Sequence, residues 1–163
     1  MTAGQSQRRF IFLGQHVGGA EILRSIVEEF APLGDEITCL ATEESDTEEI
    51  EEIMVKELKA KLHPYTPTNL KTTIESFEPT HLISAYFPKI IDTSSLEKIN
   101  CEAINLHPSR LPDYKGCFSN SWCLINNEKI TAATLHKMTN KIDEGEIVSQ
   151  EIIPIKQHDT AYT

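Results

Sequence analysis

An amide and an imidazole stand two residues apart in the segment 105–109, whose sequence is NLHPS. Residues 103–106 form a short apolar run typical of a buried strand, and side chains two apart on a strand share a face. We therefore expect Asn105 and His107 side by side at a strand end, where they can polarise a carbonyl group and stabilise an oxyanion, as acyl-type transfer requires. A buried histidine with a structural role shows the same pattern, so both interpretations stay open at this point.

A carboxylate follows at Asp143, in the connection between two predicted strands at residues 131–137 and 146–155. A carboxylate within reach of His107 would hold one tautomer of the imidazole, as a triad partner does. Asp-x-Gly is also common in turns, so Asp143 is equally explained as a turn residue. His136 on the preceding strand either contributes to the site or packs in the core. No Ser or Cys stands beside a plausible base, so we predict no covalent nucleophile.

A glycine-containing loop, residues 14–19 (GQHVGG), separates a first apolar strand from a predicted helix that ends near residue 30. Backbone N–H groups at such a helix start can face an anion. The loop matches neither GxGxxG nor a P-loop. It is interpreted either as a glycine-rich turn or as a small phosphate or sugar contact.

Strand-like and helix-like segments alternate over the N-terminal part of the chain, which predicts a doubly wound α/β sheet of mostly parallel strands. The last two predicted strands are too close in sequence for a helical crossover, so we expect an antiparallel edge. A length of 163 residues with 39% hydrophobic residues predicts a single domain over residues 1–163. Ligands are expected at the carboxyl ends of its strands.

Net charge, cysteine spacing and the length of apolar runs indicate which classes of partner to expect. The net charge of −10 argues against nucleic acid and anionic membranes, because an acidic surface repels their phosphates. The cysteines form no CxxC pair, and no cluster of His, Cys and carboxylates has ligand spacing, so we expect neither a metal nor a disulfide framework. No apolar run approaches the roughly 20 residues that span a bilayer. The chain is expected to be cytoplasmic.

The polar segments belong to a longer pattern that resembles the folate-dependent formyltransferases. Residues 105–112 (NLHPSRLP), followed by Gly116, are similar to the signature loop of this family, and residues 134–138 (TLHKM) and 142–150 (IDEGEIVSQ) are similar to its second block. The resemblance implies a formyltransferase-like domain on a Rossmann-like sheet. It also implies transfer of a formyl group from 10-formyltetrahydrofolate to a primary amine, without a metal.

Residue by residue, the resemblance implies catalytic roles for Asn105, His107 and Asp143. It places the pterin pocket on the segment before the motif strand, on the His-Pro-Ser loop and on the Asp-x-Gly loop. The implied cofactor-binding residues are Phe87, Lys89, Ile90, Ile91, Ser109, Arg110, Leu111, Pro112, Thr139, Asn140 and Ile142. The sequence departs from the family at Arg110, where leucine is more usual, and in the first loop, which lacks the phosphate cradle of glycinamide ribonucleotide transformylases.

The resemblance leaves the amine acceptor open. The first loop lacks the phosphate cradle of the purine enzymes, which argues against a purine role. Methionyl-tRNA formyltransferases have an extra C-terminal domain, and tRNA binding favours a basic surface. Our first expectation is therefore an amine on a nucleotide-linked sugar. The alternatives are a methionyl-tRNA or other amine formyltransferase, a formyltetrahydrofolate hydrolase, and a folate-binding module without catalysis. The family also has a terminal helix after about residue 160. We therefore expect either a longer protein or a second subunit, as in a homodimer, to cover that face of the sheet.

Overall fold

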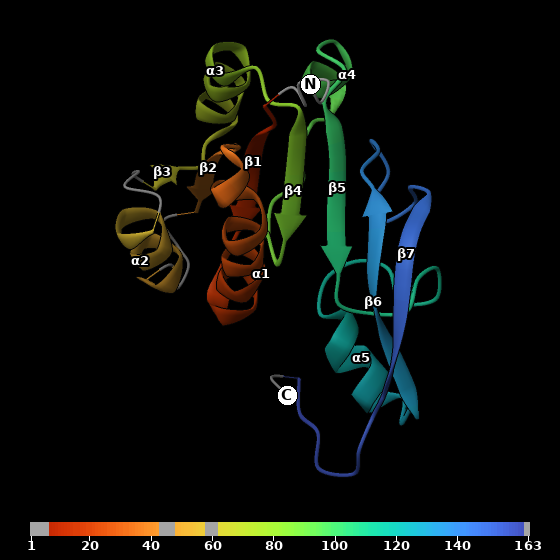
Figure 1. Ribbon diagram of the computed structural model, residues 1–163. Coiled ribbons are helices and arrows are strands. Elements are labelled where there is room, and N and C mark those ends of the chain that lie inside the picture. The colour runs from red at the N-terminus through yellow and green to blue at the C-terminus, as the bar shows by residue number, and fades with distance from the viewer. Residues whose placement is uncertain (1–6, 43–47, 58–61, 162–163) are drawn as a thin grey trace, which may run out of the picture. The chain divides into compact units, whose positions relative to one another are not determined.

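The computed structural model describes three ranges of the chain, residues 7–42, 48–57 and 62–161 (Figure 1). The chain forms two compact units: the first is Met1–Phe87 with Ser94–Ala103, and the second is Pro88–Thr93 with Ile104–Thr163. A single formyltransferase-like domain over residues 1–163 stays a prediction.

The strands of the first unit are parallel and follow one another in the order β3, β2, β1, β4. Strands β2 and β4 pair with opposite sides of β1, so the direction of winding reverses there, as the doubly wound prediction requires. Strand β1 supplies much of the core, because Ile11, Phe12 and Leu13 are fully buried. The strands are β1 Arg9–Gly14, β2 Glu36–Ala41, β3 His63–Pro64 and β4 His81–Ala85.

The helices of the first unit form where the sequence supplies an apolar face and a start signal. In α1, Ala20, Leu23 and Val27 recur at helical spacing and are buried. Helix α3 begins with a proline, and the hydroxyl of Thr66 before it accepts the N–H of Asn69, which caps the helix. The helices are α1 His16–Phe30, α2 Glu48–Lys56, α3 Pro67–Phe77 and α4 Ser94–Glu97, with a 3-10 turn at Ala31–Leu33.

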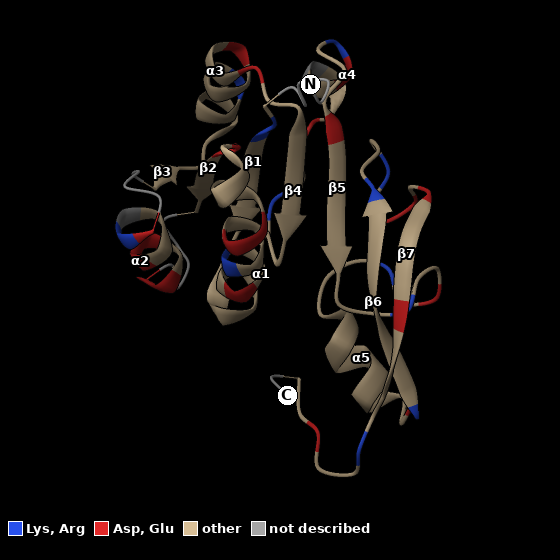
Figure 2. Cartoon of the chain, in the orientation of Figure 1, with Lys and Arg blue, Asp and Glu red and all other residues tan. Residues whose placement is uncertain are grey.

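Helix α2 carries most of the acidic run in the sequence. Its first turn is acidic and its last turn contains Lys56, which complements the helix dipole (Figure 2). Its apolar side chains Ile50, Ile53 and Met54 are buried, so the charges occupy the opposite, solvated face. The sequence predicts this helix over residues 46–60, of which residues 46–47 and 58–60 lie outside the described residues.

The second unit contains the antiparallel edge. Strand β6 (Ile130–Lys137) runs antiparallel to both β5 (Glu102–His107) and β7 (Ile147–Pro154), as predicted from the short connection between the last two strands. Helix α5 (Ser119–Ile125) lies between β5 and β6 in the chain (Figure 1). The first two residues of β5 still belong to the first unit.

The chain turns after β7. The carboxylate of Asp159 accepts the N–H of Lys156 at 2.7 Å, and the N–H of Asp159 donates to the carbonyl of Lys156 at 3.1 Å. The terminal helix implied by the resemblance would follow residue 161, outside the described residues.

Over the ranges that the structure describes, no helix is long and apolar enough to cross a membrane.

Candidate active site

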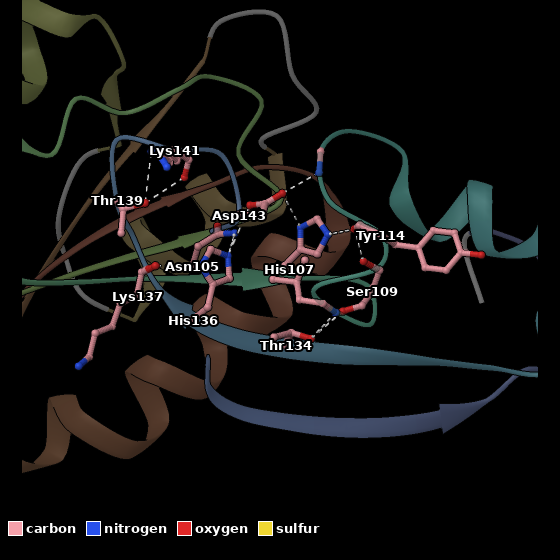
Figure 3. Close-up of polar contacts among 12 residues, drawn as sticks. Asn105, His107, Ser109, Tyr114, Thr134, His136, Lys137, Thr139, Lys141 and Asp143 are labelled. Atoms are coloured by element: carbon pink, nitrogen blue, oxygen red, sulfur yellow. Dashed lines mark hydrogen bonds and ion pairs between the residues drawn. The ribbon is translucent and has the colours of Figure 1, made fainter. Parts of the chain in front are cut away.

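The register between β5 and β6 gathers polar side chains on one face of the second unit. Asn105 pairs with His136, and His107 pairs with Thr134. Since side chains two apart on a strand share a face, all four point the same way (Figure 3). The side-by-side placement of Asn105 and His107 that alternation predicts is therefore present.

Asp143 reaches this face from the connection between β6 and β7 (Figure 3). Its Oδ2 lies 3.4 Å from Nδ1 of His107, and its Oδ1 lies 3.5 Å from Nε2 of His136. The backbone N–H of Gly116 also donates to Oδ2, at 2.7 Å. One nearly buried carboxylate is thus shared by two buried imidazoles, and the structure brings Asn105, His107 and Asp143 together.

Local backbone geometry positions this carboxylate. Asp143 has a φ of 51°, in the left-handed region that Asp and Asn tolerate better than most residues. Two residues later, a Cβ on Gly145 would lie only 1.7 Å from the carbonyl oxygen of Lys137. The loop can therefore pass the end of β6 only with glycine at this position.

The contacts of His107 define its hydrogens. Its Nε2 lies 2.6 Å from the carbonyl oxygen of Tyr114, which can only accept, so Nε2 carries a hydrogen. Its Nδ1 faces the Asp143 carboxylate. Both ring nitrogens face acceptors, an arrangement that the imidazolium form satisfies. The hydroxyl of Ser109 donates to the same Tyr114 carbonyl, at 2.6 Å.

The electrostatics of the cluster follow from burial and from the shared carboxylate. Burial disfavours the charged form of Asp143, but hydrogen bonds from His136 and the Gly116 N–H, with the charge of His107, hold its pKa below the ordinary value. Burial also disfavours a charge on His136, but the Asp143 carboxylate and the Lys137 carbonyl outweigh burial and raise the pKa of His136. The carboxylate therefore stays ionised at neutral pH.

A buried network that sequence reasoning missed holds the His-Pro-Ser loop. The Thr134 hydroxyl donates to the carbonyl of Ser109 at 2.6 Å, and the Gln150 side-chain amide donates to the carbonyl of Leu111 at 3.0 Å. The carbonyl of Tyr114 was also missed. Of these groups, only Thr134 leaves a signal in the sequence, because it precedes His136 by two residues and so shares its face.

Several of the residues implied for the pterin pocket lie on two linked segments of the second unit. The Thr93 hydroxyl donates to Oδ1 of Asn140 at 3.0 Å and so connects segment 88–93 with segment 139–143. Ile90 and Ile142 on these segments are 76% and 55% exposed, whereas Ile91 is buried. Exposed apolar side chains of this kind suit contact with a flat heteroaromatic ring.

The other implied pocket residues have different surroundings. Leu111 is buried, Arg110 forms an ion pair with Asp113 at 2.9 Å, and the Thr139 hydroxyl donates to the carbonyl of Lys141. Lys89 and Pro112 are exposed. Phe87 lies in the first unit, where its ring meets the Tyr65 ring edge-on at 4.7 Å.

Two other expectations concern a metal and the first loop. Within residues 7–42, 48–57 and 62–161, no group of three or more His, Cys, Asp or Glu side chains is placed to hold a metal ion. Gly18, which the sequence places in the first loop, belongs to the first turn of α1, and a Cβ at this position would meet the Tyr86 ring at 2.7 Å. Close packing therefore accounts for this glycine, and a phosphate or sugar contact at residues 14–19 stays a prediction.

Comparison with known proteins gives relatives of one kind. Residues 30–163 match the family described as Formyl transferase. The bifunctional polymyxin resistance protein ArnA of Wigglesworthia glossinidia brevipalpis is 40% identical over 111 residues, which cover 65% of this chain and 17% of that protein. The methionyl-tRNA formyltransferase of Lactobacillus johnsonii is 30% identical over 164 residues, covering 94% of this chain and 51% of that protein.

A third relative is the GDP-perosamine N-formyltransferase of Brucella melitensis biotype 1, 36% identical over 88 residues, which cover 54% of this chain and 34% of that protein. The chain thus spans about half the length, or less, of the curated relatives it matches.

Solved structures agree with the fold. Glycinamide ribonucleotide transformylase 1 from Symbiobacterium toebii has a TM-score of 0.80 at 19% identity, covering 97% of this chain and 79% of that one. Phosphoribosylglycinamide formyltransferase from Bacillus halodurans has a TM-score of 0.78 at 18% identity, covering 95% and 84%. At such identities the likeness establishes the fold alone, and it confirms the predicted Rossmann-like, mostly parallel sheet with an antiparallel edge. Since the family match takes in β5, β6 and the Asp143 loop as well as most of the remaining chain, this protein belongs to the formyl transferase family.

Proposed function

We propose that this chain carries the catalytic centre of an enzyme that transfers a formyl group from 10-formyltetrahydrofolate to an amine on a nucleotide-linked sugar. The observation that carries the proposal is the buried cluster in which Asn105, His107 and Asp143 meet on one face of the second unit. When bound, 10-formyltetrahydrofolate supplies the formyl carbonyl. The segments 88–93 and 139–143 are our candidates for holding its pterin ring.

Asn105 has the features of an oxyanion donor. One N–H of its side-chain amide donates to Nε2 of His136, at 3.1 Å. In the described part of the chain, the second N–H has no protein partner. A donor that is fixed at one end and free at the other can stabilise an oxygen that gains negative charge during transfer.

His107 and Asp143 have different roles in the proposed reaction: His107 supplies a positive charge, and Asp143 accepts a proton from the amine. Since both nitrogens of His107 already face protein acceptors, we assign it the role of a fixed cation next to the carbonyl rather than a proton shuttle. The lowered pKa of Asp143 makes this carboxylate a weak base. It accepts the amine proton only after the nitrogen has bonded to the carbonyl carbon and become acidic. The bond between the formyl carbon and the donor nitrogen then breaks, and that nitrogen takes up the proton as it leaves.

The choice of acceptor rests on charge and on one relative. A net charge of −10 opposes binding to a tRNA backbone, and the relative from Brucella is named for a nucleotide-linked amino sugar. The competing acceptor is methionyl-tRNA, which is favoured by the relative from Lactobacillus that aligns with 94% of the chain.

The test is formyl transfer by the full protein to GDP- and dTDP-linked amino sugars and, in parallel, to methionyl-tRNA. Asp143→Asn should lower kcat by about 10²–10³. Asparagine accepts the positive φ of this position, so the backbone is preserved. The matched control is Asp113→Asn, because Asp113 is an exposed aspartate of the neighbouring loop whose carboxylate pairs with Arg110 across three residues. Full turnover by Asp143→Asn would remove this carboxylate from the mechanism, and transfer to methionyl-tRNA alone would replace the acceptor.

A further inference from the structure

We propose that His136 is a positioning residue that, in its neutral form, aims the free N–H of Asn105 at the reacting carbonyl. Protonation of His136 would turn that amide away. The catalytic part of this inference rests on the proposed function. The structural part, the link between the protonation of His136 and the orientation of Asn105, stands independently of the reaction.

The tautomer of His136 is set by its own backbone surroundings. Its Nδ1 lies 2.9 Å from the carbonyl oxygen of Lys137, which can only accept, so Nδ1 carries the hydrogen. In the neutral ring, Nε2 is then left with a lone pair. Nδ2 of Asn105 lies 3.1 Å from this lone pair and donates to it (Figure 3).

This hydrogen bond decides which end of the Asn105 amide is available. With Nδ2 held at His136, the amide presents its second N–H, the polarity that a developing oxyanion needs. If the amide turned over, its carbonyl oxygen would take the place of the N–H group and repel negative charge. Asn105 and His136 are register partners on neighbouring strands, so their backbones keep the two side chains together.

The surroundings of His136 contain one carboxylate, which can balance a positive charge on His136 or on His107 but not on both. Facing His136 are Asn105 and His107 from β5, Asp143 from the loop and the apolar Ile147 from β7. One carboxylate balances one imidazolium, and the His107 ring is only 6.4 Å from that of His136. A second proton would leave an uncompensated charge in a nearly buried cluster, so protons on the two rings compete.

A proton on His136 changes the partner that Asn105 needs. Nε2–H and the Asn105 NH₂ group would then be two donors facing each other at 3.1 Å. The Asp143 carboxylate, whose Oδ1 is 3.5 Å from Nε2, attracts this proton, and Asn105 would relieve the contact between the two donors by turning its carbonyl oxygen toward His136. The arrangement in which Nε2 of His136 accepts the Asn105 N–H therefore requires a neutral His136 ring, and acidification moves the cluster away from it.

The structural part is tested by NMR of the ¹⁵N-labelled full protein, with His136→Gln used to assign the ring. We expect the neutral ring of His136 to be the Nδ1–H tautomer, and the side-chain NH₂ signals of Asn105 to shift with the same midpoint as His136. An Nε2–H tautomer of neutral His136, or Asn105 signals that do not shift as His136 titrates, would overturn the proposal. Because this measurement needs no turnover, it separates failure of the inference from failure of the proposed function.

The catalytic part is tested by a double-mutant cycle. His136→Leu removes the acceptor and should lower kcat by about 10- to 100-fold, with a smaller effect on KM for the formyl donor. In an Asn105→Ala background, the same substitution should cost nothing further, because His136 acts through Asn105. His136→Gln offers a carbonyl acceptor that does not titrate, so it should retain most activity and lose the acidic limb that His136 imposes on kcat. Equal losses in both backgrounds, or an unchanged pH profile in His136→Gln, would show a structural role only.

Discussion

Gly145→Ala should strongly destabilise the protein, although the change adds a single methyl group. The new Cβ would lie 1.7 Å from the carbonyl oxygen of Lys137 and 2.7 Å from its carbonyl carbon. An ordinary contact between carbon and a carbonyl oxygen is about 3.3 Å or longer. Both neighbours are backbone, so the loop and the end of β6 must move apart by about 1.6 Å.

The cost can be worked out from the contacts that this movement breaks. The N–H of Lys137 donates to the carbonyl of Glu146 at 2.9 Å, and a separation of that size takes the pair beyond hydrogen-bonding range. Overpacking of this kind costs about 1–3 kcal/mol, and the lost hydrogen bond adds about 1 kcal/mol. We therefore expect the free energy of unfolding to fall by about 2–4 kcal/mol, a large share of a typical domain's stability. Asp143, two residues away, should be displaced, so kcat should fall as well.

Urea unfolding followed by circular dichroism and by the fluorescence of Trp122 checks this value. Trp122 is the only tryptophan of the chain and lies in α5 of the second unit. The matched control is Gly19→Ala in α1, where the new Cβ would have its nearest neighbours at 3.4 Å. Alanine is favoured over glycine inside a helix by about 1 kcal/mol, so the control should keep or gain stability. If Gly145→Ala unfolded within about 0.5 kcal/mol of wild type, the role given to this glycine would be refuted.

Two further predictions concern ligand and pH. Ile142→Ser should raise KM for the formyl donor up to about tenfold through lost apolar contact. Ile152 on β7 is similarly exposed, and Ile152→Ser should leave KM unchanged; equal effects of the two substitutions would place the pterin away from residue 142. Asp143 has a lowered pKa, so its contribution to stability is present above the ordinary carboxyl range and is lost as pH falls through its folded-state pKa. His136 has a raised pKa, so its contribution is present below the ordinary histidine range and is lost as pH rises through its folded-state pKa. The difference in unfolding free energy between wild type and Asp143→Asn should therefore peak at about pH 5–6 and shrink on both sides, and a difference that did not vary with pH would contradict the ion pairs.

The parts of the fold that the sequence predicts are those with a clear apolar pattern. Residues 10–13 form an apolar run of strand length, the buried positions of α1 recur at helical spacing, and both elements form. Strand β3 has two residues and α4 has four, too short for either period to show. The antiparallel edge was predictable because a short connection excludes a helical crossover.

Only the part of the site that lies on a single strand was predictable from the sequence. Alternation along β5 places Asn105 and His107 on one face whatever lies next to them. Which β6 residues oppose them depends on register, and the long connection from β5 through α5 to β6 does not fix register in the sequence. The pairing of Asn105 with His136, and of His107 with Thr134, therefore becomes visible only in the structure.

Asp143 shows why a turn residue and a proposed catalytic residue need not be alternatives. The Asp-x-Gly sequence places the aspartate at a φ of 51° and allows Gly145 to pass the Lys137 carbonyl. These are conditions of the turn, and they also direct the carboxylate toward His107, His136 and the N–H of Gly116. A turn with other residues could connect β6 to β7 but would not deliver a buried carboxylate between two imidazoles. The same short motif thus serves the backbone and supplies the carboxylate of the proposed chemistry.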